Sequence, residues 1–219
     1  MAKIILLTGG SGLVGSNIRN HKYSSNYKIL SPSSSDLNLL NYQSIEDYIA
    51  FNKPEIVIHA AGIVGGIQAN INYPVKFLVD NMQIGLNILM AAKTKMVKNF
   101  INLGSSCMYP KNSKNPLSED VLLKGEFETT NEGYSIANIT STRLCEYINR
   151  EDSSFLYKTV IPCNIYGKYD NFSYDSSHMI PGVIRRIYDA KNNNSKHVNI
   201  WGDGLARREF MYAEDLADF

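Results

Sequence analysis

The sequence predicts an α/β fold, in which a doubly wound parallel β-sheet is followed by the beginning of a smaller substrate domain. Short apolar runs of strand length alternate along the chain with longer segments of helical periodicity. The apolar runs are continuous, which is typical of strands that are buried on both faces of a parallel sheet. This alternation predicts parallel strands that are joined by right-handed crossovers.

The first predicted strand covers residues 3–8, and a glycine-rich turn leads from it into a helix that ends near Arg19. The segment 75–95 has the pattern of a long amphipathic helix. Its spacing places these residues toward the core: Phe77, Leu78, Met82, Leu86, Leu89 and Met90. The other predicted strands cover residues 27–30, 55–60, 98–103 and 158–162, and the other predicted helices cover residues 42–51 and 134–150.

The composition is that of an ordinary globular protein, with 219 residues, 44% hydrophobic and 20% charged. A formal net charge of +1, with no basic stripe or acidic tail, gives no reason to expect nucleic acid or an anionic membrane as a partner. The first apolar run is too short to span a membrane and lacks a cleavage site for a signal peptide. Three widely spaced cysteines argue against a disulfide framework or a metal site, so we expect a cytoplasmic protein without metal.

The turn after the first strand has the glycine spacing of a dinucleotide-binding motif. Gly9 permits a tight turn, Gly12 lets the backbone approach a pyrophosphate, and Gly15 lets the helix pack on the strand. The helix N-terminus then offers N–H groups to the phosphates. The residues that we expect to bind the cofactor here are Gly9, Gly10, Ser11, Gly12, Leu13, Val14 and Gly15. The alternative is a plain strand-to-helix turn, but the context on both sides favours a Rossmann-type cofactor site.

The choice between NAD and NADP depends on the residues about twenty positions beyond the glycines. Asp36 could accept a hydrogen bond from the ribose hydroxyl, but it lies late and is better placed to cap the next helix. The serines of segment 31–35, Ser34 among them, could bind either form of the cofactor. The residues themselves leave this choice open.

Three further segments come after the fourth predicted strand, in the part of the chain where open α/β sheets bind ligands. They are GSSCMYP at 104–110, YSIAN at 134–138 and PCNIYG at 162–167. With the glycine turn, they resemble the extended short-chain dehydrogenase/reductase family. Within that family the chain is most similar to the GDP-L-fucose synthase branch, in segments such as VGGI at 64–67, SHMIP at 177–181 and REF at 208–210. The resemblance covers nearly the whole chain.

The resemblance implies an NADP(H)-dependent enzyme that epimerises and reduces a GDP-4-keto-6-deoxy-hexose, a GDP-sugar. A thiol and an imidazole exchange protons near neutral pH, and Cys107 and His178 correspond to the family's acid–base pair. Tyr134 and Ser105 would hydrogen-bond the oxygen on C4. Further cofactor contacts implied by the family are Ala61, Leu103, Gly104, Pro162, Asn164 and Ile165, and further substrate contacts are Arg186, Trp201 and Arg208.

Each of these residues also has a purely structural interpretation. Cys107 alone would more often be a small buried apolar side chain, and His178 a structural histidine. Tyr134 is one of fourteen tyrosines. Arg208 could be a solvated side chain, and Trp201 could belong to the core.

The sequence departs from the family pattern at one catalytic position. The family motif is Tyr-x-x-x-Lys, and here Asn138 follows Tyr134 at that spacing. Four residues along a helix place both side chains on one face, so the position is present while its charge is absent. An asparagine can hydrogen-bond a ribose but cannot make the tyrosine a stronger acid. Two alternatives therefore stay open: a C4 reductase of another nucleotide sugar, such as a GDP-6-deoxy-heptose, and a catalytically silent binding protein.

We expect residues 1–165 to form the dinucleotide-binding domain and residues 166–219 to form part of a substrate-binding region that in part returns to the sheet. The last residues, 212–219, read as the start of a helix with acidic residues in its first turn. Domains seldom end at such a point, so we expect the chain to be a fragment of a longer protein. The family also implies a homodimer, formed through helices 75–95 and 134–150.

Overall fold

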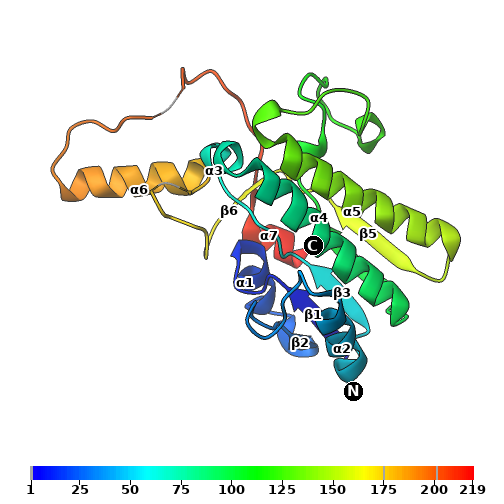
Figure 1. The fold of residues 1–219 in the computed structure, drawn as a ribbon. Coiled ribbons are helices and arrows are strands. Elements are labelled where there is room, and N and C mark those ends of the chain that lie inside the picture. The colour runs from blue at the N-terminus through cyan, green and yellow to red at the C-terminus, as the bar shows by residue number, and fades with distance from the viewer. Residues whose placement is uncertain (1, 175, 201) are drawn as a thin grey trace.

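The computed structural model describes residues 2–174, 176–200 and 202–219. Five parallel strands form the central sheet in the order β2-β1-β3-β4-β5 (Figure 1). Their bounds are β1 Ile4–Thr8, β2 Lys28–Leu30, β3 Ile56–His59, β4 Asn99–Leu103 and β5 Leu156–Val160. The predicted parallel α/β sheet is thus confirmed. β5 lies two residues earlier than segment 158–162, because Leu156 is already paired with Asn99 of β4.

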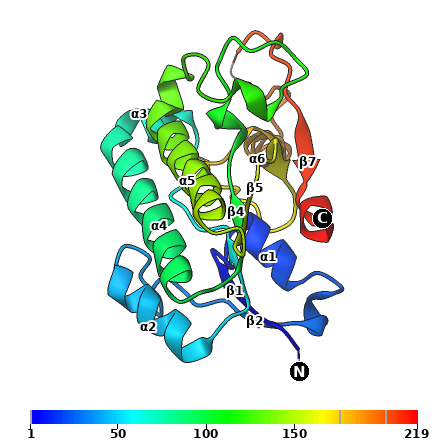
Figure 2. The ribbon, with the colours of Figure 1, turned by 90° about the vertical axis from the view of Figure 1, so that its right-hand side faces the viewer.

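Helices cover both faces of the sheet, as Figure 2 shows. One face carries α2 (Tyr42–Asn52), α4 (Pro74–Thr94) and α5 (Glu132–Glu151), and the other carries α1 (Leu13–Arg19) and α7 (Ala213–Asp218). The short elements between them are α3 Ile67–Asn72, η1 Ser24–Asn26, η2 Ser106–Met108, η3 Glu119–Val121 and η4 Thr129–Asn131. In the part of the chain that the structure describes, no helix has the length and apolarity needed to cross a bilayer.

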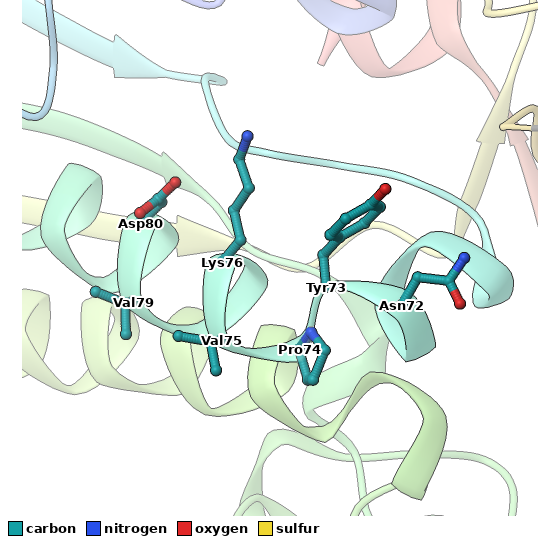
Figure 3. A pocket seen from close by; sticks show the side chains of 7 residues that line it. All are labelled: Asn72, Tyr73, Pro74, Val75, Lys76, Val79 and Asp80. Atoms are coloured by element: carbon teal, nitrogen blue, oxygen red, sulfur yellow. The ribbon is translucent and has the colours of Figure 1, made fainter.

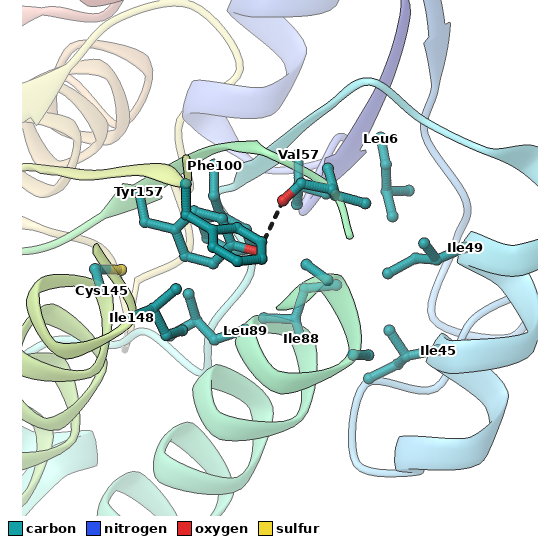
Figure 4. Packing of buried hydrophobic residues seen from close by; sticks show 14 of the residues in the cluster. Leu6, Ile45, Ile49, Val57, Ile88, Leu89, Phe100, Cys145, Ile148 and Tyr157 are labelled. Carbon is teal, nitrogen blue, oxygen red and sulfur yellow. Dashed lines mark hydrogen bonds between the residues drawn. The ribbon is translucent and has the colours of Figure 1, made fainter. Parts of the chain in front are cut away.

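The main core lies between the sheet and α2, α4 and α5. Leu6, Val57 and Phe100 point from three neighbouring strands into this layer and are fully buried. Figure 4 shows the packing of these side chains against Ile45, Ile49, Ile88, Leu89, Cys145, Ile148 and Tyr157. The Tyr157 hydroxyl satisfies its polar group there by donating to the Val97 carbonyl, 3.0 Å away.

α4 and α5 pack closely because small side chains face each other between them. A Cβ on Gly85 would lie only 2.1 Å from Oγ of Ser141. Phe77 and Leu89 of α4 are buried as the sequence predicts, but Met90 is 37% exposed. The prediction for Met90 was wrong because α4 has a second apolar stripe, which faces away from the sheet and includes Val75 and Val79. Helical periodicity alone does not tell the two stripes apart.

The chain after β5 forms a second, smaller layer. β6 (Asn164–Tyr166) and β7 (Phe210–Tyr212) pair in parallel as a two-stranded sheet, and α6 (Met179–Asn192) lies apart from the central sheet (Figure 1). α7 then returns to α1, where Asp218 accepts a hydrogen bond from His21 at 3.0 Å. The division at residue 165 stays a prediction, and that position lies inside β6.

A buried histidine links β1 and β3 at their carboxyl ends. His59 is 5% exposed, and its Nδ1 lies 2.7 Å from Oγ1 of Thr8. Burial disfavours the imidazolium and lowers the pKa of His59 to about 4. The native protein therefore holds this side chain neutral at pH values where an unfolded chain would bind a proton.

This difference predicts a loss of stability in acid that depends on His59. Because the pKa of His59 is lower in the folded than in the unfolded state, its contribution to the free energy of unfolding is fully present above about pH 6.5. This contribution is lost as the pH drops toward about 4. When the pH falls from about 7.5 to about 5, His59 should lower the free energy of unfolding by about 2 kcal/mol. Urea unfolding at the two pH values should show a smaller loss in His59→Asn and an unchanged loss in the exposed control His197→Asn. An equal loss in all three proteins would contradict the assignment.

Candidate active site

The glycine turn holds its backbone against the end of β3. Gly9 has a φ of +73°, and a Cβ there would lie 2.5 Å from the Ala60 carbonyl oxygen. A Cβ on Gly15 would lie 2.2 Å from the Gly9 carbonyl oxygen, so helix α1 can start only where no side chain intervenes. A Cβ on Gly12 would lie 3.4 Å from its nearest neighbour, the Gly9 carbonyl oxygen. Gly9 and Gly15 are thus needed by the fold itself, whereas the space beside Gly12 is open to a ligand.

The other residues of the turn lie where a Rossmann cradle has them. Leu13 is the first residue of α1 and its backbone starts the helix, while Val14 packs inward. Ser11 is exposed, and Gly10 lies beneath Oγ of Ser31 at the end of β2. The turn, the start of α1 and the end of β2 therefore surround one open region of the surface.

The serine segment after β2 is organised by Asp36. Its carboxylate accepts from the backbone N–H of Ser33 at 3.1 Å and from the Ser33 hydroxyl at 2.6 Å, and these bonds lower the pKa of Asp36. Ser33 in turn lies 2.7 Å from the Ser35 hydroxyl, and Ser34 is exposed between them. The expectation that Asp36 caps the next helix was wrong, because Asn41 accepts from Ser44 N at 3.1 Å and caps α2. Asp36 instead closes the serine turn.

The carboxyl ends of β3, β4 and β5 gather the remaining predicted cofactor residues at one edge of the sheet. Ala61 follows β3, Leu103 ends β4, and Gly104 donates its N–H to the Val160 carbonyl at 2.8 Å. Pro162 is buried after β5, and Asn164 and Ile165 form the start of β6. This arrangement is the ligand-binding edge of an open α/β sheet.

Ser105, Cys107 and Tyr134 meet where β4 ends and α5 begins. Oγ of Ser105 accepts a hydrogen bond from the backbone N–H of Cys107 at 3.4 Å. Ser135, which no sequence motif indicated, donates from its hydroxyl to the Cys107 carbonyl at 2.9 Å. Its place directly after Tyr134 was the only available signal, and this bond fixes the start of α5 against the segment that carries Cys107.

The environment keeps protons on both Cys107 and Tyr134. Burial raises the pKa of the Cys107 thiol, and hydroxyl hydrogen bonds from Ser105 and Ser135 offset part of this effect. Burial, together with the nearby Cys107, raises the pKa of Tyr134 to about 12. Only the side-chain amide of Asn138 acts in the opposite direction on Tyr134. With its pKa raised above the ordinary value in this way, Tyr134 is a protonated hydroxyl at neutral pH.

Asn138 lies one turn along α5 from Tyr134, as the motif requires. Its Nδ2 donates to the Tyr134 carbonyl at 2.9 Å. Phe77 of α4 packs edge-on against the Tyr134 ring, with the ring centroids 6.4 Å apart. Asn81, one turn beyond Phe77, binds both the N–H and the carbonyl of Ile63 at 2.7 and 3.1 Å. Phe77 thus packs the tyrosine against α4, and Asn81 joins α4 to the segment that follows β3.

His178 approaches from the smaller layer. It is exposed and immediately precedes α6, and the preceding Ser177 passes against Gly66, where a Cβ would lie 3.4 Å from the Ser177 carbonyl oxygen. Within the described residues, no hydrogen bond or ion pair connects His178 to Ser105, Cys107 or Tyr134. The structure therefore brings the other three together and leaves His178 at the rim.

The predicted substrate contacts are spread over the same smaller layer. Arg186 lies on α6, with its guanidinium 5.7 Å from the ring centroid of Tyr174. Arg208 is exposed and donates from Nη1 to the Arg207 carbonyl at 2.8 Å. Trp201 lies outside the described residues. Among those residues, no group of three or more His, Cys, Asp or Glu side chains could hold a metal ion.

Two hollows lie near the start of α4. The larger, about 440 Å³, is lined by Asn72, Tyr73, Pro74, Val75, Lys76, Val79 and Asp80 (Figure 3). None of the predicted site residues lines it, and Val75 and Val79 point away from Lys76 and Asp80 on the helix. The smaller, about 230 Å³, lies beside Tyr134. Asn70 and Asn131 also line it, and their side-chain oxygens are buried without a hydrogen-bond partner in the described part of the chain.

Comparison with known proteins identifies the family. Residues 5–219 match the NAD dependent epimerase/dehydratase family. The chain belongs to this family. It is 61% identical to the GDP-L-colitose synthase of Yersinia pseudotuberculosis, over 98% of this chain and 70% of that protein. The expected membership of the extended short-chain dehydrogenase/reductase family is confirmed.

Two solved structures have the same fold. A GDP-L-fucose synthetase from Naegleria fowleri bound to NADP superposes with a TM-score of 0.89 and 30% identity, over 99% of this chain and 71% of that one. A GDP-mannoheptose C4 reductase from Campylobacter jejuni with NADP bound gives a TM-score of 0.89 and 28% identity, over 99% and 70% of the two chains. The chain thus spans about 70% of the length of these relatives.

The open space at Gly12 and the crowding at Gly15 predict different effects for two similar substitutions. Gly15→Ala should lower the melting temperature strongly, since its methyl group meets backbone atoms. Gly12→Ala should melt near the parent temperature but bind NADPH at least tenfold more weakly, since the methyl group occupies the space that the pyrophosphate needs. Calorimetry and fluorescence titration with NADPH check the pair. If the folded Gly12→Ala protein bound NADPH as tightly as the parent, the pyrophosphate of the cofactor would not lie against Gly12.

Proposed function

We propose that this chain carries the cofactor site and the main catalytic residues of an NADP(H)-dependent epimerase/reductase, which converts a GDP-4-keto-6-deoxy-hexose to a GDP-6-deoxy-hexose. The observation that carries the proposal is the cluster of Ser105, Cys107 and Tyr134 at the ligand-binding edge of a Rossmann sheet. The close identity to a GDP-L-colitose synthase supports a GDP-sugar as substrate. The NADP bound to both structural relatives supports the cofactor.

The two steps of the proposed reaction, epimerisation and reduction, use different residues. The ketone at C4 acidifies the protons on the neighbouring carbons, so an acid–base pair can invert those centres. We assign this work to Cys107, which is held beside Tyr134, and to His178, which reaches the site from the rim. Ser105 and Tyr134 would hydrogen-bond the C4 oxygen and stabilise the negative charge that develops on it. Bound NADPH would supply the hydride for C4, and Tyr134 would donate its proton to the C4 oxygen.

The hollow beside Tyr134 supports a hydroxyl-rich ligand. Its lining includes the polar side chains of Asn70, Thr129, Thr130 and Asn131. Phe77 and Tyr134 add aromatic faces, against which the apolar face of a sugar packs well.

Two related substrates are favoured by particular relatives. Colitose is a 3,6-dideoxy sugar with no stereocentre at C3, so a colitose-type substrate would be inverted at C5 alone. The 61% identity to the GDP-L-colitose synthase favours such a substrate. A GDP-heptose reduced at C4 is favoured by the similarity to the Campylobacter jejuni enzyme. A silent binding protein is the third possibility, and Asn138 is the residue that favours it.

We also propose a cytoplasmic homodimer. The outward stripe of α4, with Val75 72% and Val79 52% exposed, and the exposed Ile136 and Tyr147 of α5 support an interface between copies of these helices. The three free cysteines support a reducing compartment. Sedimentation equilibrium tests the dimer, and a monomer at micromolar concentration would refute it; fractionation of the source cells tests the compartment.

The proposed reaction predicts deuterium incorporation that depends on Cys107. The protein at its full natural length, with NADPH and GDP-4-keto-6-deoxymannose in heavy water, should give a C4 alcohol with deuterium at C3 and C5 in the proton NMR spectrum. Cys107→Ser should reduce the exchange by a hundredfold or more, within the range expected for loss of an acid–base group. Cys163→Ser, which removes another half-buried thiol, should exchange at the parent rate.

The other outcomes separate the alternatives. Deuterium with inversion at C5 alone, obtained with the 3-deoxy substrate, favours the colitose variant. Reduction without exchange favours a C4 reductase. Bound NADPH with neither reaction on any of these substrates refutes the proposed enzyme and leaves a binding protein.

The raised pKa of Tyr134 predicts a distinctive pH profile for the reverse reaction. Oxidation of the C4 alcohol needs the tyrosinate, so its rate should keep rising up to a pH of about 12. Asn138→Lys places a cation beside the hydroxyl and should move this rise to lower pH by about 1 to 3 units. Thr140→Lys, two residues further along α5, adds the same charge elsewhere and should leave the profile unchanged. Equal profiles in all three proteins would show that Tyr134 is not the titrating group.

A further inference from the structure

The side chain of Arg19 turns back from the end of α1 to the start of the glycine turn. Its Nη1 donates to the Gly10 carbonyl at 3.3 Å. A Cβ on Gly10 would lie 3.2 Å from Cδ of Arg19 and 1.6 Å from Oγ of Ser31. Arg19 and Ser31, from two different elements, therefore converge over Gly10.

This place is the adenosine end of a Rossmann site. The ribose of the adenosine lies between the glycine turn and the end of the second strand, and an arginine there accommodates a 2′-phosphate where an acidic residue would bind the 2′-hydroxyl. The end of β2 adds the hydroxyl of Ser31, which faces Gly10.

The positive charge of Arg19 favours an anion beside Gly10. Among the described residues, no carboxylate lies within ion-pair distance of Arg19, so its remaining N–H groups are available. The only acidic residue in the serine segment, Asp36, is held by the backbone and hydroxyl of Ser33. The acid that would select NAD is therefore committed to the turn itself, and the available group is a cation.

We propose that Arg19 is the residue that makes this chain select NADPH over NADH, by binding the 2′-phosphate together with Ser31. The inference rests on the proposed use of NADP(H). It adds a residue that the sequence motif did not indicate, because Arg19 comes only a few positions after the last glycine and reaches the site by folding back along α1.

Binding of adenosine fragments tests the proposal without catalysis. Isothermal titration calorimetry should give a dissociation constant for 2′,5′-ADP at least tenfold lower than for 5′-ADP, which lacks the 2′-phosphate. Arg19→Gln should weaken 2′,5′-ADP binding by about 10- to 150-fold, the range for a lost charge-assisted hydrogen bond. Its affinity for 5′-ADP should not change, and this also shows that the glycine turn is intact.

Two further variants complete the design. Arg19→Lys keeps the positive charge but lacks the planar guanidinium group that can donate two parallel hydrogen bonds. This variant should retain part of the preference for 2′,5′-ADP. Arg150→Gln, an exposed arginine at the end of α5, removes the same charge far from β2 and should bind both fragments like the parent. Full 2′,5′-ADP affinity in Arg19→Gln, or equal affinity of the parent for both fragments, would overturn the assignment of Arg19. If the parent binds neither these fragments nor NADPH, the proposed cofactor fails as well.

Discussion

The contact between the glycine turn and the end of β3 is the constraint on which the rest of the site depends. Gly9 lies so close to the Ala60 carbonyl, and Gly15 so close to Gly9, that the backbone of three elements is in direct contact. This contact fixes where α1 begins relative to the sheet, and hence where its free N–H groups point. Because all five strands are parallel, the carboxyl ends of β4 and β5 lie at the same edge as the glycine turn, and so does the segment after β4 that carries the proposed catalytic residues.

The second feature that shapes the chemistry is the electrostatic environment of Tyr134. This half-buried side chain lies beside the Cys107 thiol and the Asn138 amide, and among the described residues no cation acts to stabilise a tyrosinate. A buried neutral hydroxyl is a good hydrogen-bond donor to a carbonyl oxygen, and it is a poor base. The same site therefore suits reduction of a ketone far better than oxidation of an alcohol, and a reductive step with ample NADPH would not require the missing lysine for its proton.

The sequence predicted the parts of this structure that depend on local pattern. The glycine turn, the five sheet strands and the helices of the central layers follow from periodicity and from Gly9, Gly12 and Gly15, because burial on both faces and close backbone contact restrict the residue type at each position. The parts that it missed depend on contacts between distant segments. Ser135 and Arg19 act through the carbonyls of Cys107 and Gly10, and no local pattern marks a side chain that binds a remote backbone group.

The short strands β6 and β7 were missed for a related reason. Each has three residues and gains its stability only from the other, across more than forty positions of intervening chain. Met90 shows the opposite error, since a residue that fits the apolar period of α4 belongs to a stripe that faces outward. Periodicity reports that a helix has an apolar face and does not report which surface covers it.

The residues of the proposed site stand on two different layers of the fold. Ser105, Cys107 and Tyr134 stand on the packed sheet and on α5, and Ser135 joins these elements. The segment that carries His178 follows β6 in the smaller layer, and a bond from Asn17 of α1 to the Lys168 carbonyl at 3.0 Å joins that layer to the central one. In the proposed mechanism the proton donor Tyr134 thus stands on the central layers, whereas inversion of the sugar would need His178 of the smaller layer over the ring. A chain of this design can lose epimerisation through changes around α6 and still reduce its ketone, which is one physical route by which epimerase/reductases and simple C4 reductases can share a single fold.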